Sequence, residues 1–277
     1  MIEIGIFAKT FTRPTLVEVL DAVTGHGLRT VQFNLTCAGV ASMPDMIEPA
    51  LAASIRQAFV ERGMTMAAVS GTFNMIHPDL AQRRQGLARL RVLAAACADL
   101  GTSIITLSTG TRDAEDMWRA HPENQSPDAW EELLAAIEAA VRIAEAAGVT
   151  LAFEPEVSNV VDSAQRARRL LDDIHSPRLK VVMDGANLFH AGELPRMERI
   201  LHEAFELLGD DIVLAHAKDL SHDGEAGHIA AGQGVLDYDL YVRLFNASGY
   251  RGPLILHGLD EAEVGGSVTF LQEKLRG

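Results

Sequence analysis

Short apolar runs alternate with longer segments of helical periodicity along the whole chain. The run Leu179-Lys-Val-Val-Met183 is rich in β-branched residues and does not alternate with polar positions, as is typical of a strand buried on both faces of a parallel sheet. Strands are expected at residues 2–7, 30–35, 64–70, 103–108, 150–153, 179–183, 212–216 and 254–256. Helices are expected at residues 14–25, 47–62, 80–100, 126–147, 163–175, 193–208 and 237–245, and from Ser267 onward.

This alternation indicates a parallel sheet, because each strand must be followed by a crossover helix. Eight strand–helix units in a chain of this length predict a (β/α)₈ TIM barrel, with residues 1–277 forming a single domain. The competing architecture, a doubly wound open sheet, usually has fewer strands and one ligand crevice. It would not explain polar residues at the ends of four consecutive strands.

The composition allows one large core, with 48% hydrophobic residues and a mean hydropathy of +0.08. The 24 Lys and Arg residues against 38 Asp and Glu give a net charge of −14 at pH 7, which argues against nucleic acid as a partner. No apolar run reaches membrane length, and the N-terminus lacks the basic start of a signal peptide. Two cysteines without metal spacing, Cys37 and Cys97, indicate a reducing compartment. A cytoplasmic protein without membrane association is therefore expected.

The last four expected strands each end on a residue that commonly ligates metals. These residues are Glu154, Asp184, His216 and His257. In a barrel of this kind the carboxyl ends of all strands open on one face, so the four side chains should converge there. Carboxylate and imidazole ligands without a thiolate suit Mn²⁺, Mg²⁺, Co²⁺ or Zn²⁺. We expect one divalent ion, with Mn²⁺ as the first choice.

Four motifs of the chain resemble the sugar phosphate isomerase/epimerase superfamily, the xylose isomerase-like barrels. They are Phe153-Glu-Pro155, Met183-Asp-Gly-Ala-Asn-Leu188, His216-Ala-Lys-Asp219 and Gly232-Gln-Gly234. The resemblance implies a divalent metal held by Glu154, Asp184 and His216, with a fourth ligand from the last strand. In the ketose epimerases that ligand is a glutamate, which is also one of two acid/base groups. This chain has His257 there instead, which puts a symmetric two-carboxylate mechanism in doubt.

A second departure from the relatives concerns the residue three positions after Asp184. Endonuclease IV-like and many epimerase-like members have a histidine there, whereas this chain has Asn187. An amide is a poor transition-metal ligand but a good hydrogen-bond partner for a sugar hydroxyl. This argues for one metal ion and against phosphodiester cleavage.

Further candidates to contact the substrate are Asn187, Lys218, Arg112, His77 and Glu156. Lys218 could neutralise a developing enolate or could simply pair with Asp219. Glu261 is an alternative to His257 as the fourth metal ligand.

The expected function is a divalent-metal-dependent isomerase or epimerase that acts on a small, unphosphorylated sugar or keto-sugar through a metal-stabilised enediolate. Glu154 is the expected base, and His257 is the second catalytic candidate. Two alternatives remain: a metal-dependent lyase on a keto-polyol, similar to inosose dehydratase, and a non-catalytic carbohydrate-binding barrel. The sequence does not identify the substrate or the stereocentre. It also leaves open whether the protein forms a homo-oligomer.

Overall fold

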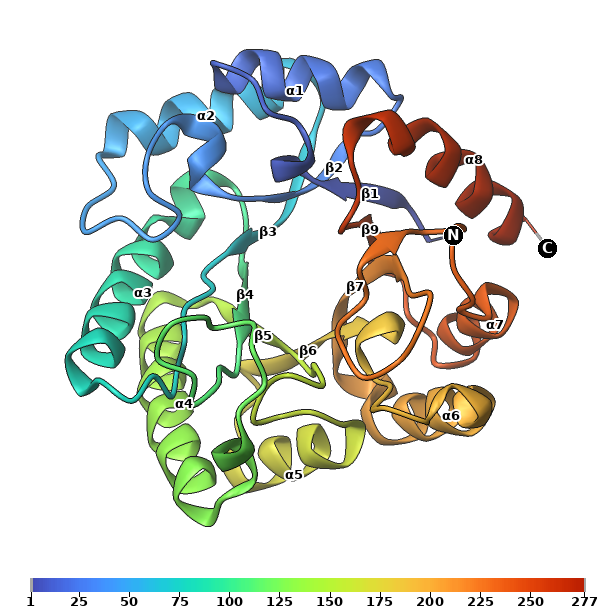
Figure 1. The fold of residues 1–277 in the computed structure, drawn as a ribbon. Coiled ribbons are helices and arrows are strands. Elements are labelled where there is room, and N and C mark those ends of the chain that lie inside the picture. Colours follow the sequence, from blue (N-terminus) through green and yellow to red (C-terminus); the bar gives the residue numbers. More distant parts are fainter. Residues whose placement is uncertain (1, 277) are drawn as a thin grey trace.

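A closed barrel of parallel strands forms the centre of the protein in the computed structural model, which describes residues 2–276 (Figure 1). The barrel strands are β1 (Ile4–Phe7), β2 (Thr30–Phe33), β3 (Thr65–Ser70), β4 (Ile104–Ser108), β5 (Thr150–Glu154), β6 (Leu179–Asp184), β7 (Ile212–Asp219) and β9 (Leu254–Leu256). Each pairs in parallel with its neighbours, and β9 closes the ring by pairing with both β7 and β1. The predicted TIM barrel is therefore confirmed; only residues 1 and 277 of the expected domain lie outside the described part.

Helices surround this barrel as an outer ring (Figure 1). They are α1 (Leu16–Gly25), α2 (Pro49–Glu61), α3 (Leu80–Leu100), α4 (Pro127–Ala147), α5 (Ala164–Ile174), α6 (Met197–Leu208), α7 (Tyr238–Ala247) and α8 (Val264–Lys274). Local capping explains their ends. Ser126 accepts a hydrogen bond from the backbone N–H of Ala129 at the start of α4, and Gly148 ends that helix at φ 70°. None of the helices within residues 2–276 has the length and apolar character needed to cross a membrane.

Two of the differences from the predicted elements concern the last helix and the loop after β7. The last helix begins at Val264 rather than Ser267, because a capping box between Asp260 and Glu263 starts the turn earlier. The loop after β7 contains an additional strand, β8 (Ile229–Ala230), which pairs antiparallel with the end of β7. Two residues are too few to leave a recognisable hydrophobic pattern, so this hairpin could not be predicted from the sequence.

Side-chain direction divides the core into two parts. Most apolar residues pack between the strands and the helices, whereas a small inner cluster fills the barrel itself. That inner cluster consists of Ala68, Ala152, Val182, Leu214 and Ile255. Because successive strand residues point to opposite faces, the residue two positions after each member of the inner cluster points inward again. Four of these later positions are Glu154, Asp184, His216 and His257, at the open end of the barrel.

An ion-pair network at the opposite end of the barrel predicts a pH-dependent contribution to stability. Asp211 lies 2.6 Å from Lys180 Nζ and 2.9 Å from Arg168 Nη1. Partial burial alone would raise the pKa of Asp211, but its bonds to Lys180 and Arg168 outweigh this and lower it. Asp211→Asn should therefore cost about 1 kcal/mol of unfolding free energy at neutral pH.

A carboxylate with a lowered pKa stabilises the folded state above its unfolded pKa, and this contribution is lost as the pH falls. The difference between wild type and Asp211→Asn should thus be complete at neutral pH and should shrink below about pH 4. Urea unfolding at several pH values measures it, with the exposed neighbour Asp210→Asn as the control. An equal effect of both variants at neutral pH would contradict the network's role.

Candidate active site

Three metal-type ligands meet where β5, β6 and β7 end. Glu154, Asp184 and His216, called the metal triad below, each offer a ligand atom, and these atoms lie within 4.8 Å of one another. His216 Nδ1 is 3.4 Å from Glu154 Oε1 and 3.5 Å from Asp184 Oδ2. Two atoms bonded to one ion at about 2.1 Å are about 3.0 to 3.4 Å apart, so this spacing suits a divalent metal. Asp184 Oδ2 is also buried, and within residues 2–276 its close neighbours are charged nitrogens without good hydrogen-bond geometry, Lys218 Nζ at 3.0 Å and His216 Nδ1 at 3.5 Å.

Neighbouring amides hold the triad in place. His216 Nε2 lies 2.7 Å from Gln32 Oε1 on β2, which fixes the proton on Nε2 and leaves Nδ1 to face the carboxylates. Asn187 Nδ2 donates to Glu154 Oε1 at 2.5 Å. Such contacts orient metal ligands before an ion binds. Gln32 was missed at the sequence level, because an amide is not a metal-type ligand and its strand carries none.

Lys218 lies among the triad carboxylates and not beside Asp219. Its Nζ is 3.0 Å from Asp184 Oδ2 and 3.7 Å from Glu154 Oε1. Asp219 instead accepts hydrogen bonds from the backbone N–H groups of Leu220, Gly232 and Leu236. The sequence alternative of a Lys218–Asp219 pair is therefore wrong, and the lysine can place positive charge next to a reacting oxygen.

Burial and mutual charge shift the ionisation of this cluster strongly. Burial alone would lower the pKa of His216, but the Glu154 and Asp184 carboxylates raise it to about 9. Burial likewise opposes charge on Lys218 and Asp184, yet their attraction raises the pKa of Lys218 and lowers that of Asp184. Glu156 shows the opposite result, since burial and then the Glu154 charge raise its pKa to about 7. The site thus combines a carboxylate that stays ionised, that of Asp184, with a carboxyl group that is readily protonated, that of Glu156.

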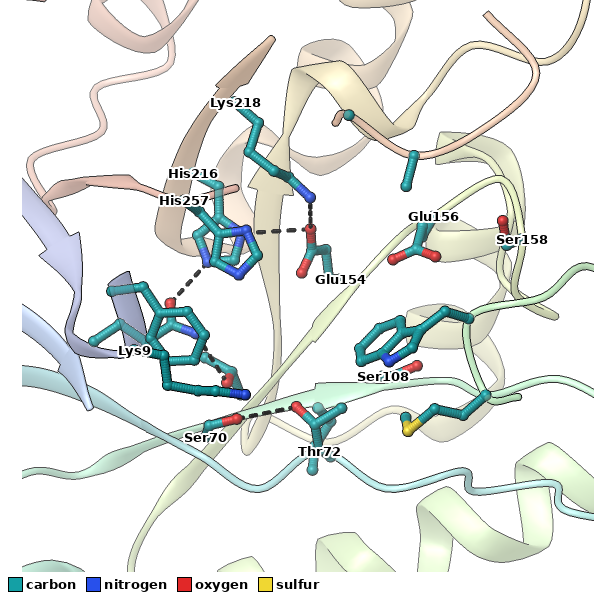
Figure 2. Close-up of a pocket in the computed structure, with 18 of the residues that line it drawn as sticks. Lys9, Ser70, Thr72, Ser108, Glu154, Glu156, Ser158, His216, Lys218 and His257 are labelled. Atoms are coloured by element: carbon teal, nitrogen blue, oxygen red, sulfur yellow. Dashed lines mark hydrogen bonds and ion pairs between the residues drawn. The ribbon is translucent and has the colours of Figure 1, made fainter. Parts of the chain in front are cut away.

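His257 directly follows β9 and lies face to face with His216. The two rings overlap in Figure 2, and their centroids are 4.9 Å apart with planes that differ by 3°. Phe7 stacks on His257, with a distance of 5.0 Å between ring centroids. Burial and the positive charges of Lys218 and His216 lower the pKa of His257, and its Nδ1 has no hydrogen-bond partner among the described residues. His257 lies outside the three-atom cluster, so its role as fourth ligand stays a prediction that requires the ring to turn out of the stack.

The alternative fourth ligand, Glu261, is engaged elsewhere. Its Oε1 is 2.6 Å from Arg13 Nη2 in an ion pair at the surface of the protein. This pairing lowers the pKa of Glu261, since the Arg13 hydrogen bond outweighs the small effect of burial. Through this ion pair Glu261 joins two loops, and it does not belong to the metal triad.

Glu154 and His216 of the triad line a cavity of about 640 Å³. Figure 2 shows the side chains around it. Of the predicted substrate contacts, Glu156 and Lys218 line it. Asn187 is fully buried outside its lining, with the amide spanning Glu154 and Gly227. Arg112 Nη1 is instead 2.8 Å from Glu132 Oε2, and His77 lines a neighbouring hollow. Asn187, Arg112 and His77 thus lie outside the lining of this cavity, and their role as substrate ligands stays a prediction.

Several cavity residues were missed from the sequence because they come from the first four strands. They include Lys9, Gln32, Ser70, Thr72 and Ser108. Ser70 and Thr72 hydroxyls are 3.2 Å apart on the wall opposite Glu154 (Figure 2). The signal that could have revealed them is their place at strand ends, because all strand ends of a barrel open on the same face.

The fold and this site define a TIM barrel with a polar cavity, and with three side chains that could hold a metal ion, at the carboxyl ends of its strands. Residues 20–274 match the xylose isomerase-like TIM barrel family, and the chain belongs to this family. No curated protein sequence matches the chain significantly.

Solved structures with the same fold include enzymes of different reaction types. A 3-keto-D-glucoside 4-epimerase from E. coli is 17% identical, with a TM-score of 0.74 over 99% of this chain and 100% of that chain. The IolI protein, solved with a zinc atom, is 14% identical, with a TM-score of 0.73 over 99% and 96%. A probable 3-DHS dehydratase from Bacillus anthracis is 11% identical, with a TM-score of 0.75 over 98% and 99%. At identities this low the comparison shows that the folds are alike. It carries no information on whether the reactions are the same.

The contact between Gln32 and His216 predicts that Gln32 controls metal affinity. Gln32→Leu keeps the side-chain volume but removes the acceptor for His216 Nε2–H, so the ring loses its fixed orientation. The affinity for Mn²⁺ should fall about 10- to 100-fold, the usual cost of losing such a contact. Calorimetric titration measures it, and Gln57→Leu on the exposed side of α2 is the matched control. An unchanged affinity in Gln32→Leu would show that packing alone orients His216.

The position of His257 predicts an order of metal affinities among three variants. His257→Glu should retain the metal, because it restores the carboxylate that relatives supply from this strand end. His257→Ala should weaken metal binding more than Glu261→Ala does, since Glu261 pairs with Arg13. Metal content after dialysis gives the order. The reverse order for the two alanine variants would make Glu261 the ligand.

Proposed function

We propose that this protein is a divalent-metal-dependent isomerase or epimerase of a small, unphosphorylated sugar or keto-sugar. The observation that carries the proposal is the metal triad at the floor of the cavity, with ligand atoms within 4.8 Å of one another. Family membership and the epimerase among the similar structures support it, as does the zinc atom of the IolI protein. The proposal includes a cytoplasmic location, which the free thiols of Cys37 and Cys97 support.

Glu154, Asp184 and His216 would hold the ion, with Mn²⁺ as first choice because two carboxylates accompany one imidazole. When bound, a divalent ion supplies positive charge that polarises the carbonyl and hydroxyl oxygens of a substrate. His257 remains the proposed fourth ligand, after rotation out of its stack on His216. A three- or four-ligand site leaves positions for substrate oxygens, as catalytic metal sites require.

Glu154 is the proposed base. Asn187, His216 and Lys218 all contact its Oε1, which leaves Oε2 for the proton next to the substrate carbonyl. These contacts also hold the carboxylate in one orientation, which favours proton abstraction at a defined position. Lys218 Nζ, buried beside the same oxygens, would stabilise negative charge that develops on the substrate.

Glu156 and His257 are the proposed groups that return a proton. Both line the cavity, and Glu156 receives a hydrogen bond from Asn159 Nδ2 at 3.1 Å. With a pKa of about 7, set by burial and then the Glu154 charge, Glu156 holds a proton in a substantial fraction of molecules at neutral pH. Two carboxyl groups with different pKa values can divide the roles of base and acid between them.

An unphosphorylated substrate fits the loops of this barrel best. Barrels usually bind phosphate after the last two strands, through free backbone N–H groups at a helix start. Here the loop after β9 carries Asp260, Glu261 and Glu263, and a capping box uses the helix-start N–H groups. These negative charges would repel a phosphate group.

A metal-dependent lyase that expels a β-hydroxyl is the second candidate. The observation in its favour is the asymmetry of the site, since β9 delivers the imidazole of His257 where a symmetric epimerase needs a second carboxylate. Proton abstraction by Glu154 would be common to both reactions. The dehydratase among the similar structures supports keeping this alternative.

A deuterium experiment tests the proposed chemistry. Manganese-loaded protein is incubated in D₂O with a panel of aldoses, ketoses, 3-keto-sugars and inososes, and products are followed by NMR and mass spectrometry. Deuterium should enter at the carbon next to the carbonyl, because Glu154 exchanges its proton with solvent. Glu154→Gln should lose at least about 100-fold in rate, since it removes the base. A loss of water from the product would identify the lyase, and conversion without solvent exchange, together with direct intramolecular transfer of a C–D label, would refute proton abstraction.

A further inference from the structure

A second group of metal-type ligands lies in the loop between β7 and β8. His222, Glu225 and His228, called the loop cluster below, each offer a ligand atom, and these atoms lie within 4.8 Å of one another. Glu225 and His228 also line the cavity. The loop cluster shares no residue with the metal triad and none with the catalytic groups proposed above.

Both imidazoles turn one nitrogen toward the same carboxylate oxygen. His222 Nε2 lies 2.9 Å from Glu225 Oε1, and His228 Nδ1 lies 3.4 Å from it. These separations are close to the 3.0 to 3.4 Å expected for atoms bonded at about 2.1 Å to one ion. The other nitrogen of each ring is 3.0 Å from Ser221 Oγ. Ser221 thus orients both rings from behind, as contacts to the far nitrogen do in established metal sites.

The electrostatics of the loop cluster favour a cation between its members. The backbone N–H of Ser221 donates to His228 Nε2 at 3.4 Å, so the proton of a neutral His228 lies on Nδ1, which faces Glu225 Oε1. A divalent ion bound at Nδ1 would take the place of that proton. A proton on His228 Nδ1 also satisfies the Ala226 carbonyl oxygen, 3.1 Å away. A divalent ion would satisfy all three ligand atoms at once.

Backbone contacts hold this loop in shape. The N–H of Gly224 donates to the Phe189 carbonyl at 2.9 Å, and the Asp223 carboxylate accepts from the N–H of Leu194 at 2.8 Å. Gly224 has φ 95°, a conformation that residues with a Cβ rarely adopt. The N–H of His228 donates to the Asp219 carbonyl at 3.1 Å, beside the β7–β8 pairing. Because the loop is already ordered, binding an ion there costs little conformational entropy.

The same loop is connected to the metal triad. The N–H of Gly227 donates to Asn187 Oδ1 at 2.8 Å, and Asn187 Nδ2 donates to Glu154 Oε1 at 2.5 Å. Asn187 is fully buried, so this connection is shielded from water. A change in the position of the loop would therefore be transmitted to the proposed base.

We propose that the loop cluster is a second, exchangeable metal site that binds a late first-row transition ion such as Zn²⁺. Two imidazoles with one carboxylate select such ions over Mg²⁺ and Ca²⁺, which prefer oxygen ligands. Three protein ligands leave a fourth position open for water or for an oxygen of an entering substrate. A bound ion would hold residues 221–228 in one position at the entrance of the cavity. Zinc binding there does not depend on whether the metal triad holds an ion.

Zinc titration of the full chain tests this proposal. In an Asp184→Ala background, which removes the buried carboxylate of the triad, one Zn²⁺ should bind per chain. Adding His222→Ala or His228→Ala should weaken that binding by at least about tenfold, as expected for losing an orienting or ligating group. Adding His202→Ala, which removes an exposed histidine from α6, should leave it unchanged. Ser221→Ala keeps all three ligands but releases the rings, so it should weaken binding to a smaller extent.

A second measurement covers the case in which Asp184→Ala does not fold. In the otherwise wild-type chain, zinc should slow hydrogen exchange of residues 221–228, and His222→Ala should abolish this effect while His202→Ala should not. Equal zinc affinity in the His222→Ala and His202→Ala proteins would overturn the proposal, as would exchange in the loop that zinc does not alter. If the metal triad alone fails to bind an ion, the proposed metal-dependent enzyme is refuted. The proposal for the loop cluster is not affected by that result.

Discussion

The alternation of side-chain direction along parallel strands is the constraint on which this structure depends. A strand of a closed barrel points every second residue into the interior, where only small or branched apolar groups fit. At the open end of the barrel, the next inward position meets the cavity and can carry a polar group. The pairs of inner core residue and cavity residue are Ala152 and Glu154, Val182 and Asp184, Leu214 and His216, and Ile255 and His257.

Burial of two carboxylates at adjacent strand ends would be costly without positive charge. Lys218 and His216 provide it, with Lys218 Nζ 3.0 Å and His216 Nδ1 3.5 Å from Asp184 Oδ2. The oxygens that these groups contact are also the proposed metal-binding atoms. An ion in the triad and the ammonium of Lys218 therefore share the same carboxylates, and the balance between them sets how tightly an ion is held.

Two departures from the relatives change how the site is built. His257 places a ring that stacks on His216 at the strand end where the resemblance implied a glutamate, and this makes the two sides of the cavity chemically different. Asn187 introduces an amide that joins Glu154 to the backbone of Gly227. The first departure affects the reaction, because it leaves one strand-end carboxylate fewer. The second ties the base to the loop that carries His222, Glu225 and His228.

The sequence by itself determined the barrel and the meeting of the metal triad, because both follow from local periodicity and from strand ends. Glu154, Asp184 and His216 end buried runs, so a parallel barrel had to bring them together. Only the tertiary structure decided which partner each polar group took. Lys218 turned to Asp184 rather than Asp219, Arg112 to Glu132 rather than the cavity, and Gln32 on β2 became the support of His216. These choices depend on rotamers and on charges from strands far apart in the sequence, and no local pattern carries that information.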